Sequence, residues 1–185
     1  MHGLAFLIRS FAAISALAVS TVTATAADTY LVEVLVFENP GGMDSREYFP
    51  TMQNPAPTEA ASAPSSVRYS GAGLSALASV LSKNAGYRVL ASTGWQQALA
   101  DRASAPAVPV APPGAGRVLP EVNGTLRVYE SAPLLFLETD LSFNPAGVTE
   151  IFRLREKRRV KLNELHYFDH PRFGALVRVS RVPQG

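Results

Sequence analysis

The chain has 185 residues, of which 47% are hydrophobic and 17% charged, and its formal net charge is +2. This length and composition suit one globular domain with a substantial core. The charge is too small for the dense basic surface that nucleic-acid-binding proteins usually carry, so we expect no nucleic-acid partner. The chain contains no cysteine, which excludes disulfides, thiol chemistry and an acylated N-terminal cysteine.

The N-terminal residues have the three-part pattern of a signal peptide. After a weakly positive start, residues 11–22 are apolar or small, and residues 24–26 (Ala-Thr-Ala) form a small-x-small cleavage signal. The apolar run is shorter than the ~20 residues that a membrane-spanning helix needs, and no later segment approaches that length. We therefore expect residues 1–26 to be removed on export, leaving a single secreted domain over residues 27–185 without a membrane span.

The first half of the mature region predicts strand, loop, helix and strand. Residues 30–37 are rich in β-branched residues and predict a central strand that is covered on both faces. Residues 38–70 are punctuated by proline and glycine and predict a long flexible surface loop. Residues 74–84 have apolar side chains at helical spacing, and residues 87–95 read as a second strand.

The second half predicts another loop and a run of strands. Residues 103–120 are rich in proline and alanine and predict a flexible loop. Residues 124–129 and 134–143 predict a hairpin, followed by strands at 151–162 and 175–182. In sum we predict an α+β fold, with one mostly antiparallel sheet, a helix packed on one face and long Pro/Ala-rich loops.

The strand expected at 151–162 has the most distinctive charge pattern. With a period of two, five cations share one face at a spacing of ~6.6 Å. These residues, called the basic row below, are Arg153, Arg155, Lys157, Arg159 and Lys161. The row fits an extended anionic polymer if the protein's own acids do not neutralise it. The alternative is a solvated strand face whose charges prevent edge-to-edge aggregation.

A histidine-rich segment follows the basic row. His166, Asp169 and His170 are residue types that ligate metals. Their spacing resembles the two-histidine helical zinc motif, but Tyr167 stands where that motif has its glutamate, and Pro171 disfavours helix at His170. In the alternative, which we favour, these side chains bond backbone groups in a turn. We accordingly expect no metal and no other cofactor.

Other signals of chemistry are sparse. The side chain of Trp95 can stack on a sugar and the amide of Gln97 can bond hydroxyls, although a single tryptophan is more often a core residue. The sequence has no serine nucleophile elbow, no cysteine nucleophile and no glycine-rich phosphate loop. We therefore expect no catalytic residues.

Three segments together resemble one known family. The run RLREKRRVKLNELHYFDHPRFGALVRV resembles the hallmark of the CsiV-like family of periplasmic peptidoglycan-binding proteins of Gram-negative bacteria, in which a basic RR strand leads to ELHYxDHPxFGxLV. The run YLVEVLVFE resembles the first strand of that family. YRVL at 87–90, with Trp95 and Gln97, resembles its middle motif. One departure is that no basic residue stands beside Trp95.

The resemblance implies a non-catalytic periplasmic protein that binds peptidoglycan and supports cell-wall assembly and cell shape. We further expect a wall-synthesis enzyme or its activator as a second partner. Because wall peptides carry free carboxylates, which guanidinium groups pair with well, we expect the basic row to bind them. The other candidate ligand-binding residues are Trp95, Gln97, His166, Tyr167 and His170.

Two alternative functions remain open. The first is an envelope protein–protein interaction module that uses a sheet edge or the long loops. The second is a metal-dependent wall hydrolase centred on His166, Asp169 and His170.

Overall fold

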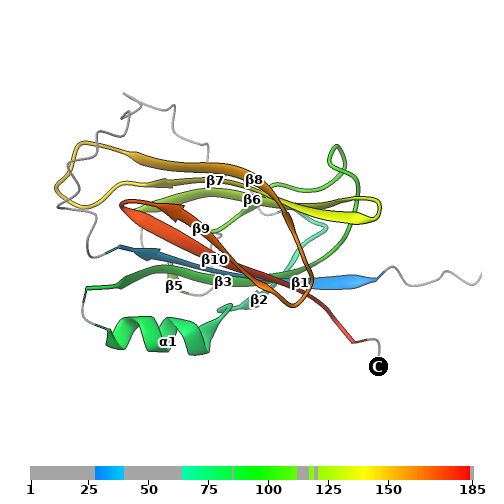
Figure 1. Cartoon of the computed structure of the whole chain (residues 1–185), viewed down its shortest axis with the longest axis horizontal. Coiled ribbons are helices and arrows are strands. Elements are labelled where there is room, and N and C mark those ends of the chain that lie inside the picture. The colour runs from blue at the N-terminus through cyan, green and yellow to red at the C-terminus, as the bar shows by residue number, and fades with distance from the viewer. Residues whose placement is uncertain (1–27, 40–63, 85, 112–116, 119–120, 184–185) are drawn as a thin grey trace, which may run out of the picture.

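The computed structural model in Figure 1 describes residues 28–39, 64–84, 86–111, 117–118 and 121–183. Within these ranges it has ten strands and one helix. They are β1 (Thr29–Glu38), β2 (Arg68–Gly71), α1 (Ser75–Lys83), β3 (Arg88–Ala98), β4 (Val108–Pro109), β5 (Arg117–Val118), β6 (Val122–Ser131), β7 (Leu134–Phe143), β8 (Phe152–Val160), β9 (Leu165–His170) and β10 (Phe173–Arg181).

The strands form two antiparallel sheets that stack face to face (Figure 1). The six-stranded sheet has the order β2-β3-β1-β10-β9, and β5 also pairs with β3. The four-stranded sheet has the order β4-β6-β7-β8. β1 is central because it pairs along its length with β10 on one side and with β3 on the other, as its apolar run predicts.

The core lies between the two sheets. Inward valines of β1, such as Val32 and Val34, belong to the same buried cluster as Leu126 of β6 and Leu137 of β7. Four aromatic rings in this cluster, those of Trp95, Phe143, Phe168 and Phe173, are fully buried. Burial of this apolar surface is the main favourable contribution to folding, and it needs both sheets.

The prediction of an α+β fold built on one sheet is wrong. The protein is mostly β, and a second sheet, not a helix, covers the inner face of the first. The helix α1 has nine residues, none of them fully buried, and its Leu77 and Leu81 add only a small cluster with Leu35 and Val89. The alternation in the C-terminal strands shows which side chains face a core, but it does not show with which strands they pair.

The predicted leader and parts of both predicted loops lie outside the described residues. This holds for residues 1–26, for 40–63 of the first loop, and for 112–116 and 119–120 of the second. Within the second predicted loop, Val108 belongs to the short strand β4, and Val108 and Val110 are buried in the core. In the part of the chain that the structure describes, no helix is long and apolar enough to span a bilayer.

Candidate functional site

The basic row lies mainly on β8, the edge strand of the four-stranded sheet. Alternation along β8 buries Leu154 and Val160 in the core and leaves Arg155, Lys157 and Arg159 exposed on the opposite side. Arg153, at the start of the strand, has the same outward parity and is half-buried. Lys161 follows the end of the strand. The four cations of β8 therefore share one face, as a period of two predicts.

Two acids on the neighbouring strand face this row. In the register of β7 with β8, Asp140 is opposite Arg155, and Glu138 is opposite Lys157. Arg127 on β6 is in turn opposite Glu138. Because cross-strand neighbours lie within reach of one another, these side chains form a band of alternating charge across the sheet.

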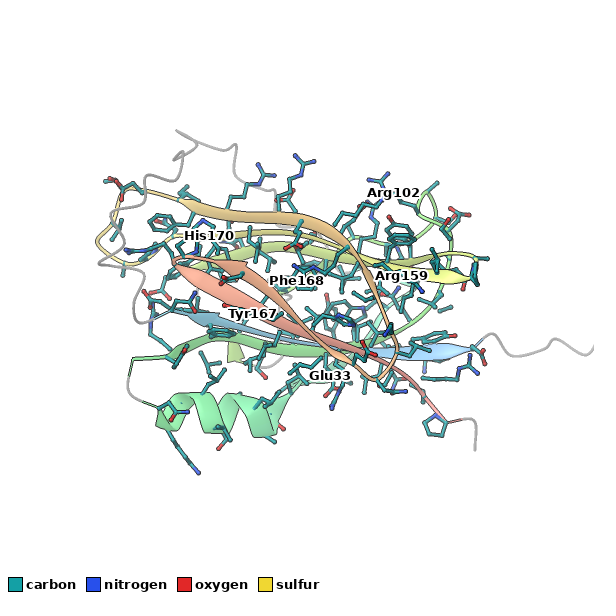
Figure 2. The ribbon with its side chains drawn as sticks, in the orientation of Figure 1. Glu33, Arg102, Arg159, Tyr167, Phe168 and His170 are labelled. Carbon is teal, nitrogen blue, oxygen red and sulfur yellow. The ribbon has the colours of Figure 1, made fainter. Side chains whose placement is uncertain are left out.

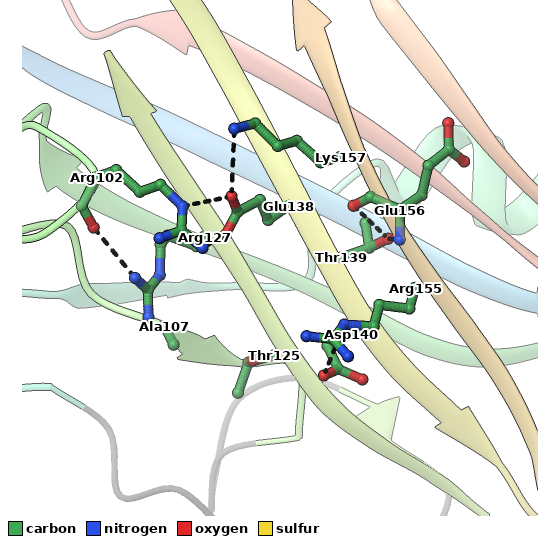
Figure 3. A pocket seen from close by; sticks show the side chains of 10 residues that line it. All are labelled: Arg102, Ala107, Thr125, Arg127, Glu138, Thr139, Asp140, Arg155, Glu156 and Lys157. Atoms are coloured by element: carbon green, nitrogen blue, oxygen red, sulfur yellow. Dashed lines mark hydrogen bonds and ion pairs between the residues drawn. The ribbon is translucent and has the colours of Figure 1, made fainter. Parts of the chain in front are cut away.

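An open groove of about 520 Å³ runs over this band (Figure 3). The charged side chains that line it are Arg102, Arg127, Glu138, Asp140, Arg155, Glu156 and Lys157. Of the three acids, Glu156 has the same parity on β8 as Arg158 and pairs with it, so both lie on the opposite side of the strand from the basic row. The outer face of the four-stranded sheet therefore has more cations than acids.

Asp140 neutralises only part of the basic row. Arg153 donates two hydrogen bonds to it, at 2.8 and 2.7 Å, and these bonds raise the pKa of Arg153. The Nε atom of Arg155 is 4.0 Å from Oδ2 of Asp140, and the Arg155 side chain is 77% exposed. Within the described residues Arg159 makes no ion pair. Arg155 and Arg159 are thus the cations of the row best placed to bind a ligand.

Glu138, like Asp140, is shared between two cations. Arg102 donates hydrogen bonds to both carboxylate oxygens of Glu138, at 2.7 and 3.2 Å, and Lys157 Nζ lies 3.9 Å from one of them. The hydrogen bonds from Arg102 are the main cause that lowers the pKa of Glu138. Glu138 is therefore ionised at neutral pH, and one carboxylate faces two cations.

An aromatic pair lies beside the row on the same face. The rings of Tyr129 on β6 and Phe136 on β7 stack with centroids 5.5 Å apart, and Lys157 Nζ lies 5.5 Å from the Phe136 ring. Phe136 is half-buried and is directly opposite Arg159. Sequence reasoning missed this pair. The signal that could have found it is the alternation along the predicted strand 134–143, which places Phe136 on the opposite side from Leu135 and Leu137.

Trp95 and Gln97 lie in the core, away from this face. Both side chains are buried. The indole N–H of Trp95 donates to Gln97 Oε1 at 2.8 Å, and Gln97 Nε2 donates to the carbonyl of Val128 on the other sheet at 3.2 Å. This chain of bonds satisfies a buried amide and joins the two sheets. Neither side chain reaches the surface, so neither belongs to the candidate binding surface.

The histidine segment forms the strand β9 and the start of a tight turn, not a helix. His166 and His170 are four residues apart along β9, and Asp169 has the opposite parity, so the three side chains do not converge on one point. Among the described residues no three potential ligands are grouped to hold a metal ion. This geometry removes the structural basis for a hydrolase centred on these residues.

Both imidazoles bond backbone groups, as the favoured alternative predicted, but they do so from the strand β9, and Asp169 accepts from the Tyr167 hydroxyl instead of bonding the backbone. His166 Nε2 accepts from the backbone N–H of Lys161 at 3.1 Å, and His170 Nδ1 accepts from that of Arg172 at 3.1 Å. Burial lowers the pKa of His170, whose ring also contacts the rings of Phe152 and Phe173.

Tyr167 lies on the outer face of the six-stranded sheet, whereas the basic row lies on the outer face of the four-stranded sheet. Its ring stacks on Phe37 at 6.1 Å, and its hydroxyl donates to Asp169 Oδ1 at 2.5 Å. Burial and Asp169 raise the pKa of Tyr167 to about 12, so the hydroxyl stays protonated. Figure 2 shows Arg159 and Arg102 toward the hairpin end of the four-stranded sheet, and Tyr167 and His170 on β9. The structure thus groups the basic row but not the other predicted contacts.

Comparison with known proteins identifies the family of this chain. Residues 64–182 match the sequence model of a family described as "Peptidoglycan-binding protein, CsiV". The match covers all strands from β2 to β10, including the whole outer face of the four-stranded sheet. No curated protein and no solved structure gives a significant match.

Proposed function

The chain belongs to the CsiV family of peptidoglycan-binding proteins, and from this premise we propose that it holds the cell-wall polymer on the outer face of its four-stranded sheet without catalysing a reaction. The observation that carries the proposal is the row of outward cations on β8, of which Arg155 is only loosely paired and Arg159 has no ion pair among the described residues. Peptidoglycan offers such a row its natural counterpart, a polymer with repeated carboxylates.

The expected interaction is a set of weak contacts that act together. A guanidinium pairs with a carboxylate through two parallel hydrogen bonds where geometry allows. Each exposed pair contributes only ~0–1 kcal/mol, so useful affinity needs several pairs along one polymer strand. Binding of this kind weakens as salt screens the charges.

The shape of the surface suits an extended ligand. The groove of about 520 Å³ is open to solvent and lies across the band, with lining residues from β6, β7 and β8. The half-buried ring of Phe136 adds an apolar surface on which a sugar ring can stack. The face therefore combines contacts for the peptide carboxylates with one for the glycan.

We further place the protein in the periplasm, exported by the predicted leader at residues 1–26, where it supports wall assembly and cell shape. A wall-synthesis enzyme or its activator would be its second partner. The opposite face of the sandwich favours that partner, because Leu165 and Tyr167 are exposed there. If protein interaction were instead the sole function, purified wall sacculi would not retain the protein.

The test is sedimentation with purified sacculi. The variant Arg155→Ala/Arg159→Ala removes two cations from the binding face. The matched control, Arg68→Ala/Lys83→Ala, removes two cations from β2 and α1. We expect the first variant to lose most of the retention at low salt and the control to keep it. Equal retention of the two variants would show that the row is only a solvated strand face.

A further inference from the structure

A second cavity is lined by residues from the tip of the β6–β7 hairpin and from the β8–β9 connection. Both segments lie toward the right-hand end of the sandwich in Figure 1. Its volume is about 410 Å³, within the range of small-molecule sites. Arg159, the last cation of the basic row on β8, lines this cavity, and Lys161 follows it. The cationic face of the four-stranded sheet therefore continues into this cavity, which is open to solvent.

The walls of this end pocket combine cations with leucines. Arg159, Lys161 and Arg181 line it together with one acid, Glu130. Its apolar part is made mainly by leucines, namely Leu99, Leu134, Leu135 and Leu162. An apolar lining with a few convergent charged groups is the usual composition of a site for a small organic ligand.

The three cations differ in whether they are already paired with acids of the protein. Lys161 Nζ is 3.2 Å from Glu164, and Arg181 is 3.3 Å from Asp28 with its guanidinium 5.7 Å from the Tyr30 ring. Arg159 makes no ion pair within the described residues. A carboxylate that entered the pocket would therefore meet Arg159 first, without displacing an acid of the protein.

We propose that this end pocket binds the carboxyl-terminal D-alanine end of a peptidoglycan stem peptide. Such an end has a free carboxylate next to small methyl side chains, which matches a guanidinium above leucine side chains. The inference rests on the proposed function and refines it, because a glycan strand lying along β7 and β8 brings its stem peptide to Arg159.

The test uses a soluble probe, N-acetyl-D-alanyl-D-alanine, and its carboxamide, titrated into the isotope-labelled protein and followed by NMR shifts. We expect the acid to bind up to about fivefold more tightly than the amide, the upper range for one exposed guanidinium–carboxylate pair. Shifts should concentrate on amides of the β6–β7 tip and the β8–β9 connection. Equal shifts for both probes, or no binding of the acid, would overturn the proposal.

A matched pair of variants locates the site. Leu162→Glu places an acid in the pocket, whereas Leu165→Glu places one on the outer face of the other sheet; the two leucines are 36% and 46% exposed. We expect only Leu162→Glu to abolish acid binding, with folding of both variants checked by their NMR spectra. Wild-type affinity of Leu162→Glu would refute the pocket. Sedimentation of the wild-type protein with sacculi tests the proposed function separately, because the basic row does not depend on Leu162.

Discussion

Arg158 and Arg159 are consecutive residues, yet their side chains lie on opposite faces of β8. The guanidinium of Arg158 is 4.4 Å from the centre of the Phe168 ring on β9, and it donates to the carbonyl of Tyr167 at 2.8 Å. It also pairs with Glu156. Arg158 therefore links the edges of the two sheets, while Arg159 points to the exposed face and is available to a ligand.

This division of roles predicts different effects of two neighbouring substitutions. Arg158→Ala should lower the free energy of unfolding by about 1–3 kcal/mol, because it removes a charge-assisted hydrogen bond and a cation–π contact. Arg159→Ala should change it by less than about 0.5 kcal/mol, as exposed substitutions usually do. Urea denaturation measures both values. Equal losses of stability would contradict the assignment.

Removal of an acid from the binding face should strengthen binding. Asp140→Asn frees Arg153 and Arg155 from their common partner, so retention on sacculi should rise at low salt and converge with wild type at high salt. Asp169→Asn is the control, because it removes the same charge from the outer face of the other sheet. Sedimentation compares the two variants. Unchanged or weaker retention of Asp140→Asn, or the same gain in the control, would count against a carboxylate ligand.

Gly174 has no room for a side chain. A Cβ atom there would lie 2.7 Å from Cε2 of Tyr167 and 3.0 Å from Cζ of Phe37. Gly174→Ala should therefore destabilise the protein by about 1–3 kcal/mol. In a Tyr167→Leu background the penalty should fall, because one of the two clashing rings is gone. A double-mutant cycle by urea denaturation measures this coupling, and additive effects would show that Tyr167 is not the obstacle.

The buried imidazole of His170 predicts a pH dependence of stability. Burial, opposed by Asp169 and reinforced by Arg172, lowers its pKa in the folded protein below the usual 6.5. The unfolded chain then binds more protons in this window, so stability is complete above about pH 6.5 and falls as the solution becomes more acidic. Thermal unfolding at about pH 5 and pH 7.5 measures the difference. His170→Asn, which keeps an acceptor for the Arg172 N–H, should reduce it. An unchanged difference in this variant would assign the effect to other groups.

The local elements of the fold follow largely from hydrophobic periodicity. The apolar run at 30–37 corresponds to β1, and the alternation at 151–162 corresponds to β8. The division of the strands into two sheets does not follow from this periodicity. It depends on which strands pair, and β1 pairs with β10, which lies far away in the sequence. The strand β9 was also missed, because only Phe168 in it is buried and its histidines suggested other chemistry.

The candidate site could be predicted where it depends on one strand and not where it depends on several. The outward parity of Arg155, Lys157 and Arg159 needs only the period of β8. The acids Asp140 and Glu138 come opposite these cations through the register with β7, which no local pattern reveals. The position of Trp95 in the core likewise depends on the second sheet, whose Val128 carbonyl accepts the bond from Gln97.

The most direct test changes the polymer and leaves the protein intact. Sacculi whose free carboxylates have been converted to neutral amides keep their glycan but lose the partner proposed for the cationic face. In sedimentation at low salt, the wild-type protein should be retained by untreated sacculi and released into the supernatant with amidated sacculi. Equal retention on both kinds of sacculi would contradict carboxylate recognition by the outer face of the four-stranded sheet.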